Sequence, residues 1–151
     1  MINETFLPLE AERITNNLKK DILEYLPEIF ISEKTASTND DAKVYLLNQS
    51  SELSIHLTEQ QEAGKGRNGK KWVSPKGKNI YLSLGWKSPL QYSELDGLSL
   101  SVGCIVANAL NSPANDQINI KWPNDLLINQ KKMSGILIET VDLEGQVGIV
   151  I

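Results

Sequence analysis

The chain has 151 residues, of which 40% are hydrophobic and 23% are charged, a composition typical of one soluble globular domain and not of a disordered segment. Its formal net charge of −4 argues against a general binder of nucleic acids or membrane surfaces. Because there is one cysteine, Cys104, and one histidine, His56, the sequence excludes an internal disulfide and a histidine-based metal cluster.

Residues 1–8 carry neither the basic nor the apolar region of a signal peptide, and no apolar run approaches the length of a membrane span. A single cysteine also fits a reducing compartment. We therefore expect a cytoplasmic protein with no membrane partner.

An amphipathic helix is predicted over residues 9–26, and Pro27 ends it. Its apolar positions recur at helical spacing and are Ile14, Leu18, Ile22 and Leu26. We interpret residues 1–28 as an N-terminal helical segment that docks on the main domain, residues 29–151.

A short strand at residues 29–31 precedes a helix predicted over residues 39–48. Ser37 and Thr38 each stand three residues before an aspartate, which is a helix N-cap signature. The inward face of this helix should carry Ala42, Tyr45 and Leu46. Capping alone explains the two hydroxyls, and a ligand role ranks second.

A strand at residues 54–58 leads into the glycine-rich loop, residues 61–72. This loop combines small residues with cations: Gly64, Gly66 and Gly69 with Lys65, Arg67, Lys70 and Lys71. No acidic residue occurs between Glu62 and Glu94, whereas seven of the fifteen lysines and arginines do. Glycines allow positive φ and a close approach of N–H groups to a ligand, so the loop could hold an anion, or it could be a solvated charged loop.

The strand predicted at residues 79–86 places its large apolar side chains on one face and its smaller ones, with Tyr81, on the other. The helix predicted over residues 93–110 should be the most buried one, with Cys104 as a small interior residue. Strands follow at residues 118–122, 126–128, 132–138 and 146–151. The last has no polar end, so we expect an unfinished sheet edge, a fragment of a longer fold, and association with a second copy, as in a homodimer.

Three stretches together resemble the catalytic domain of biotin protein ligases: residues 37–39, residues 61–72, and residues 121–125 followed by 131–137. The resemblance covers about residues 30–151 and implies an α/β (α+β) fold with a mixed, largely antiparallel sheet and helices packed against it, as in class II synthetases. The family's C-terminal remainder and small barrel are missing from the pattern. No N-terminal helix-turn-helix pattern occurs, so we expect no DNA partner.

The resemblance implies a ligase that uses ATP and Mg²⁺ to convert biotin to biotinyl-5′-AMP and then transfers biotin to a lysine of a biotin carboxyl carrier domain. Cations and N–H groups suit this reaction because a carboxylate and a polyphosphate repel each other. A lipoate or octanoate protein ligase shares the fold and is the nearest alternative. A non-catalytic remnant that binds biotin or a partner is another.

The resemblance also assigns roles. Biotin's ring head would receive hydrogen bonds from four polar residues: Ser37, Thr38, Asn39 and Gln61. The loop would close over the adenylate through Gly64, Lys65, Gly66 and Arg67, with Trp72 at its edge. Lys132 and Gly135 complete the expected binding residues. The expected catalytic residues are Arg67, Lys121, Asp125 and Lys132, and Asp125 could contact Mg²⁺. For Lys121, Trp122 and Asp125 a purely structural role at a strand end and turn is nearly as good an interpretation.

The sequence departs from the family pattern at two loop positions. Lys65 and Asn68 stand where family members often have arginine. Lysine lacks the bidentate fork of arginine, and asparagine lacks the charge. We therefore expect a loop with weaker affinity for the intermediate.

Overall fold

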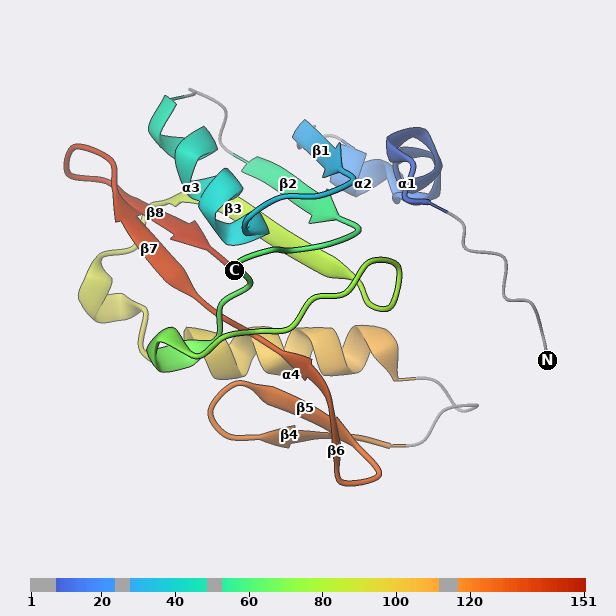
Figure 1. The fold of residues 1–151 in the computed structure, drawn as a ribbon. Coiled ribbons are helices and arrows are strands. Elements are labelled where there is room, and N and C mark those ends of the chain that lie inside the picture. The colour runs from blue at the N-terminus through green and yellow to red at the C-terminus, as the bar shows by residue number, and fades with distance from the viewer. Residues whose placement is uncertain (1–7, 24–27, 49–52, 112–116) are drawn as a thin grey trace. The chain divides into compact units, whose positions relative to one another are not determined.

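The computed structural model describes residues 8–23, 28–48, 53–111 and 117–151, and they belong to two compact units. Unit 1 comprises Met1–Pro89 and Glu139–Ile151, and unit 2 comprises Leu90–Ile138. Each unit has its own sheet (Figure 1). Among the described residues, no helix is both long enough and apolar enough to span a membrane.

Unit 1 is built on a five-stranded mixed sheet. Its strands, in spatial order, are β1 (Glu28–Ser32), β2 (Leu53–Thr58), β3 (Tyr81–Ser88), β8 (Val147–Val150) and β7 (Glu139–Asp142). β1 and β2 are parallel, and the other neighbouring pairs are antiparallel. The predicted mixed, largely antiparallel sheet is therefore confirmed.

Helix α3 (Thr38–Asn48) packs on this sheet through Ala42 and Leu46, which form a buried cluster with Val150 of β8. Two of its three predicted inward residues are therefore fully buried, and Tyr45 is half-buried. A Cβ at Gly85 of β3 would lie 3.3 Å from the Ala42 Cβ, so the small residue lets the helix approach. The buried face of β3 is consequently its small-residue face.

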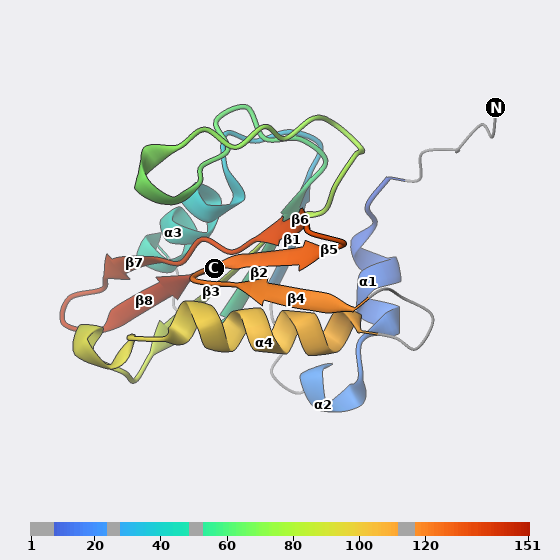
Figure 2. The same cartoon turned by 90° about the horizontal axis from the view of Figure 1, so that it is seen from below.

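Unit 2 combines helix α4 (Leu98–Leu110) with a three-stranded antiparallel sheet (Figure 2). The strands are β4 (Ile118–Lys121), β5 (Asp125–Ile128) and β6 (Lys131–Gly135), and a short 3₁₀ turn, η2 (Tyr92–Glu94), precedes the helix. Ala107 of α4 packs with Ile118 and Leu126 in a buried cluster. A Cβ at Gly103 would lie within 4.0 Å of Leu126, so this face of α4 carries small residues that face the hairpin.

The single helix predicted over residues 9–26 is wrong within the described residues. Helix α1 (Ala11–Asn17) ends where Leu18 adopts an extended conformation (ψ 145°), and α2 (Lys20–Leu23) follows. The Asn17 side chain donates to the Arg13 carbonyl at 2.7 Å, a local bond that competes with helix propagation. Residues 24–27, including Pro27, lie outside the described residues, and the division at residue 28 stays a prediction.

The prediction for the helix of residues 93–110 is also wrong in three respects. The helix begins at Leu98, because Gly97 before it has a left-handed conformation (φ 81°). It is not the most buried helix: its fully buried residues are Gly103 and Ala107, whereas Ile105 is 66% exposed. Cys104 is exposed rather than interior. Burial follows the small residues that allow close packing instead of the large apolar ones.

Two strand predictions at the C-terminal end need correction. The strand predicted at residues 132–138 is β6, which ends at Gly135; residues 136–138 lie in no strand, and a separate strand, β7, begins at Glu139 in unit 1. β8 is not an edge strand, because it pairs with β3 on one side and β7 on the other. The ground for expecting a homodimer through this strand is therefore removed.

Candidate functional site

A buried polar cluster joins the first turn of α3 to the start of the glycine-rich loop. The Gln61 carbonyl oxygen Oε1 accepts hydrogen bonds from the Thr38 backbone N–H at 3.0 Å and from the Thr38 hydroxyl at 3.2 Å. The side-chain nitrogen Nε2 of Gln61 donates to the Ser74 hydroxyl at 3.1 Å. Thr38 and Ser74 are buried and Gln61 is half-buried, so these bonds fix both side chains.

The same cluster reaches the sheet through Ser83 of β3. The Ser83 hydroxyl donates to Asn39 Oδ1, and its oxygen lies 2.8 Å from Thr38 Oγ1. Asn39 Nδ2 donates to Glu139 Oε2 of β7 at 2.8 Å. Both ends of the Asn39 amide therefore have protein partners, which favours a role in orienting its neighbours.

Ser37 is buried, and its carbonyl accepts the Asp41 N–H at 3.1 Å, as expected of the residue that begins the helix. The structure thus places four predicted ring-head residues together: Ser37, Thr38, Asn39 and Gln61. Sequence reasoning missed Ser74, Ser83 and Glu139 as their partners. The signal for Ser83 was its place beside Gly85 on the small-residue face of β3.

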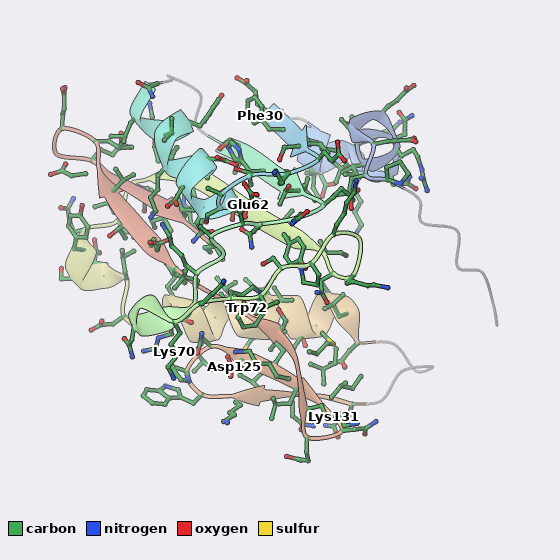
Figure 3. The ribbon with its side chains drawn as sticks, in the orientation of Figure 1. Phe30, Glu62, Lys70, Trp72, Asp125 and Lys131 are labelled. Carbon is green, nitrogen blue, oxygen red and sulfur yellow. The ribbon has the colours of Figure 1, made fainter. Side chains whose placement is uncertain are left out.

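The glycine-rich loop is a narrow hairpin (Figure 3, where Glu62, Lys70 and Trp72 are labelled). The Trp72 N–H donates to the Gly64 carbonyl at 2.8 Å, and the Gly66 N–H donates to the Lys70 carbonyl at 2.7 Å. A 3₁₀ turn, η1 (Arg67–Gly69), forms its tip. Trp72 is half-buried at the edge of the loop.

The three loop glycines have different roles. Gly69 has positive φ (71°), as does Asn68 (58°), a residue type that tolerates this region. Gly66 has an ordinary extended conformation (φ −117°). At Gly64 an added Cβ would lie 2.6 Å from the Trp72 carbonyl oxygen, so this position requires glycine for space. Of the three loop glycines, Gly69 alone uses the positive φ that glycine allows.

All four cations of the loop are exposed, and one of them, Lys65, is ion-paired. Arg67, Lys70 and Lys71 are exposed. Lys65 Nζ lies 2.6 Å and 2.8 Å from the two carboxylate oxygens of Asp40. The hydrogen bond to Asp40 raises the pKa of Lys65. Burial acts to raise the pKa of Asp40, but the lysines beside it outweigh burial and lower this pKa.

A second group of predicted residues lies on the unit 2 sheet. Lys132 Nζ forms an ion pair with Asp125 Oδ1 at 2.6 Å. The strand register places Lys121 opposite Asp125 on one side and Gly135 opposite it on the other. In Figure 3, Asp125 and Lys131 lie at opposite ends of the β5–β6 hairpin, as this register requires. Trp122 is 78% exposed and precedes Pro123 in a cis peptide bond.

The predicted Mg²⁺ contact at Asp125 stays a prediction. Mg²⁺ prefers several oxygen ligands. The Asp125 carboxylate carries an ion pair with Lys132, and the described part of the chain contains no group of three His, Cys, Asp or Glu residues that could hold a metal ion. The described residues therefore offer no all-protein Mg²⁺ cage, and Asp125 would contact Mg²⁺ only together with nucleotide phosphates.

The chain is similar to known biotin ligases in sequence. It is 37% identical over 143 residues to the bifunctional ligase/repressor BirA of Salmonella typhimurium, covering 93% of this chain and 41% of that protein. It is 34% identical over 110 residues to the biotin--[acetyl-CoA-carboxylase] ligase of Paracoccus denitrificans, covering 71% of this chain and 45% of that protein. The chain thus spans less than half the length of these relatives.

Solved structures agree. The biotin protein ligase of Leishmania major in complex with biotinyl-5-AMP matches with a TM-score of 0.62 and 28% identity, over 82% of this chain and 56% of that one. The enzyme of Aquifex aeolicus in complex with biotin and ATP matches with a TM-score of 0.58 and 26% identity, over 82% and 51%. The family model described as "Biotin/lipoate A/B protein ligase family" matches residues 31–151. The chain therefore belongs to the biotin/lipoate A/B protein ligase family, as a relative of the biotin protein ligases.

Proposed function

We propose that this chain provides the biotin- and ATP-binding part of a biotin protein ligase. In the first step a carboxylate oxygen of biotin attacks the α-phosphorus of ATP, the bond to the β-phosphate oxygen breaks, and pyrophosphate leaves. In the second step the neutral amine of an acceptor lysine attacks the acyl carbon, AMP leaves, and the amine loses a proton. The acceptor is a biotin carboxyl carrier domain.

The observation that carries the proposal is the polar cluster of Thr38 and Gln61 next to a basic hairpin. A ureido ring head needs fixed donors and acceptors, and the cluster holds hydroxyl and amide groups in place by mutual hydrogen bonds. The hairpin that begins at Gln61 carries exposed cations toward its tip, where an anion would find them. Relatives bound to biotin, ATP and biotinyl-5-AMP support the same assignment.

The residues of this chain would share the work as follows. Thr38 and Gln61 orient the ring head, and the exposed guanidinium of Arg67 contacts the carboxylate or phosphate oxygens. Lys132 stabilises negative charge that develops at the α-phosphate, once the anion replaces Asp125 as its partner. ATP would bring Mg²⁺ on its own phosphates, so no protein step depends on a resident metal site.

Calorimetric titration with biotin, then with biotin plus Mg-ATP, tests the proposal. We expect biotin to bind wild-type protein and to bind more tightly when Mg-ATP is present. In Arg67→Ala the increase in biotin affinity produced by Mg-ATP should be smaller by at least about ten-fold, because a charge-assisted hydrogen bond to phosphate is worth about 1.5–3 kcal/mol. Lys78→Ala is the matched control, since it removes an exposed cation outside the loop.

Three other results would argue against the proposal. Absence of heat with biotin from folded protein would reject it. Tighter binding of lipoate than of biotin would assign the chain to the lipoate branch of the family. Biotin binding that ATP does not change would point to a remnant that binds without catalysis.

A further inference from the structure

Lys65 holds the glycine-rich loop against helix α3. Its ammonium contacts both carboxylate oxygens of Asp40, at 2.6 Å and 2.8 Å. Asp40 lies in the first turn of α3, directly after the buried residues 37–39. The contact therefore joins the loop to the part of the helix that carries the proposed ring-head residues.

Asp40 belongs to a network that reaches the sheet. Lys43 Nζ lies 3.5 Å from Asp40 Oδ1 and 2.6 Å from Glu139 Oε1 of β7. The other oxygen of Glu139 accepts from Asn39. The side chains of Lys43 and Glu139 are only 22% and 26% exposed, whereas that of Lys65 is 43% exposed. Because its inner members are held in place, the network costs less side-chain entropy than an isolated surface pair.

The backbone fixes the base of the loop separately. The Glu62 N–H donates to the Thr35 carbonyl and the Ala63 N–H donates to the Ala36 carbonyl, both at 2.9 Å. Beyond Ala63 the hairpin bonds to itself, through Gly64 with Trp72 and Gly66 with Lys70. These internal bonds shape the hairpin but do not set its distance from α3. Beyond the base of the loop, the Lys65–Asp40 pair is a side-chain contact that does so.

We propose that Asp40 is a positioning residue, which holds Lys65 and thereby the glycine-rich loop against the first turn of α3. This inference rests on the proposed function for its consequence in ligand binding. A loop that is already ordered loses less conformational entropy when ligand binds. Removal of the Asp40 charge should therefore loosen the loop and weaken biotin binding without unfolding unit 1.

Hydrogen exchange on the full chain tests the positioning itself, with no ligand present. In Asp40→Asn we expect the Glu62 and Ala63 amides, which donate to the Thr35 and Ala36 carbonyls before α3, to exchange about two- to five-fold faster than in wild type, the range expected for losing a surface ion pair. Asp40→Glu should restore much of the protection. The double variant Asp40→Asn/Lys65→Gln should match Asp40→Asn, because the two residues act through one contact.

Glu33→Gln is the matched control, because it removes an exposed carboxylate that pairs with Lys76 outside the loop. Unchanged exchange in Asp40→Asn would overturn the proposal. So would an equal acceleration in Glu33→Gln, because the effect would then reflect net charge. Circular dichroism verifies that each variant is folded.

Biotin calorimetry on the same variants supplies the second readout. We expect Asp40→Asn to bind biotin about two- to five-fold more weakly, with the loss restored in Asp40→Glu. Tighter binding in Asp40→Asn would overturn the proposal, because it would mean that Asp40 competes with the ligand for Lys65. If wild-type protein binds no biotin, the proposed function fails, while the exchange rates still decide whether Asp40 positions the loop.

Discussion

Gly64 and Gly66 lie two positions apart in the loop but meet different surroundings. A Cβ at Gly64 would lie 2.6 Å from the Trp72 carbonyl oxygen and 2.8 Å from the Ser74 hydroxyl, and a Cβ at Gly66 would find its nearest atom at 3.5 Å. We expect Gly64→Ala to lower the free energy of unfolding by about 1–3 kcal/mol through overpacking, and to weaken biotin binding. Urea denaturation and calorimetry measure the two effects.

Gly66→Ala serves as the control for this change, because its φ of −117° suits alanine. It should alter the free energy of unfolding by less than about 0.5 kcal/mol. Equal costs at both positions would show that flexibility, and not space, is what the loop requires of its glycines.

His56 should make stability depend on pH. It is buried and stacks on the Phe30 ring at a centroid distance of 4.9 Å, and burial lowers its pKa although the charge of Asp41 acts to raise it. Between the unfolded value of 6.5 and the lower folded value, the unfolded chain binds more protons. The contribution of the neutral His56 to the free energy of unfolding is therefore complete above pH 6.5. As the pH drops below 6.5 this contribution is lost, by at most about 1.4 kcal/mol per pH unit.

The variant His56→Gln cannot titrate, so its urea midpoint should stay level over the same pH range. The chain has no other histidine, which makes the assignment direct. An equal slope in both proteins would transfer the effect to another group.

At the scale of elements, helix α3 shows how adjacent apolar residues differ in their contribution to the free energy of unfolding. Leu46 is 2% exposed in a cluster with Ala42 and Val150, whereas Leu47 is 57% exposed. We expect Leu46→Ala to cost about 2–5 kcal/mol of unfolding free energy and Leu47→Ala less than about 0.5 kcal/mol. Chemical denaturation of the two variants compares them, and similar costs would contradict the packing of α3 on the sheet.

Local patterns predict the elements whose burial follows hydrophobicity. The α3 helix, the strands β1, β2, β3 and β8 of the mixed sheet, and the hairpin around residues 118–128 all follow from spacing and turn residues, whereas β7 was not predicted. The burial of helix α4 does not follow from apolar spacing, because its buried positions are the small residues Gly103 and Ala107. These residues are buried because the β4–β5 hairpin packs closely against them. The strand predicted over residues 132–138 ran past the end of β6, and β7 was missed, because strand ends and strand partners cannot be deduced from apolar spacing alone.

The candidate site divides in the same way. The stretches around Thr38, Gln61 and Lys132 carry enough motif to be named from the sequence. The residues that bond to these stretches cannot be named from the sequence, because a partner such as Glu139 lies 100 residues from Asn39 along the chain. Asp40 looked like a helix-terminus acid in the sequence, and the structure adds its ion pair with Lys65. Long-range partners depend on the fold, which local patterns do not specify.

At the scale of the whole molecule, the charge is unevenly distributed along an acidic chain. The net charge is −4, yet residues 63–93 contain seven cations and no acid. Such a local reversal attracts an anion most strongly at low ionic strength, where the Debye length is long. Nucleotide binding should therefore weaken with added salt, and biotin binding should change less because biotin carries a single charge.

The variant Lys70→Gln/Lys71→Gln tests where this attraction originates. It removes two exposed loop cations and changes the net charge from −4 to −6 (−4 − 2). We expect it to weaken ATP binding several-fold at about 0.02 M salt and to match wild type at about 1 M, where the Debye length is about 3 Å. Isothermal titration across the salt series measures both limits.

Lys19→Gln/Lys20→Gln gives the same net charge from two exposed lysines, one just before α2 and one at its first residue, and separates local from global electrostatics. Because these lysines lie outside the basic interval, ATP affinity should match wild type at every salt concentration. If both double variants weaken ATP binding equally, net charge governs the attraction and the loop has no special field. If only the loop variant does, the basic hairpin is where the phosphates bind.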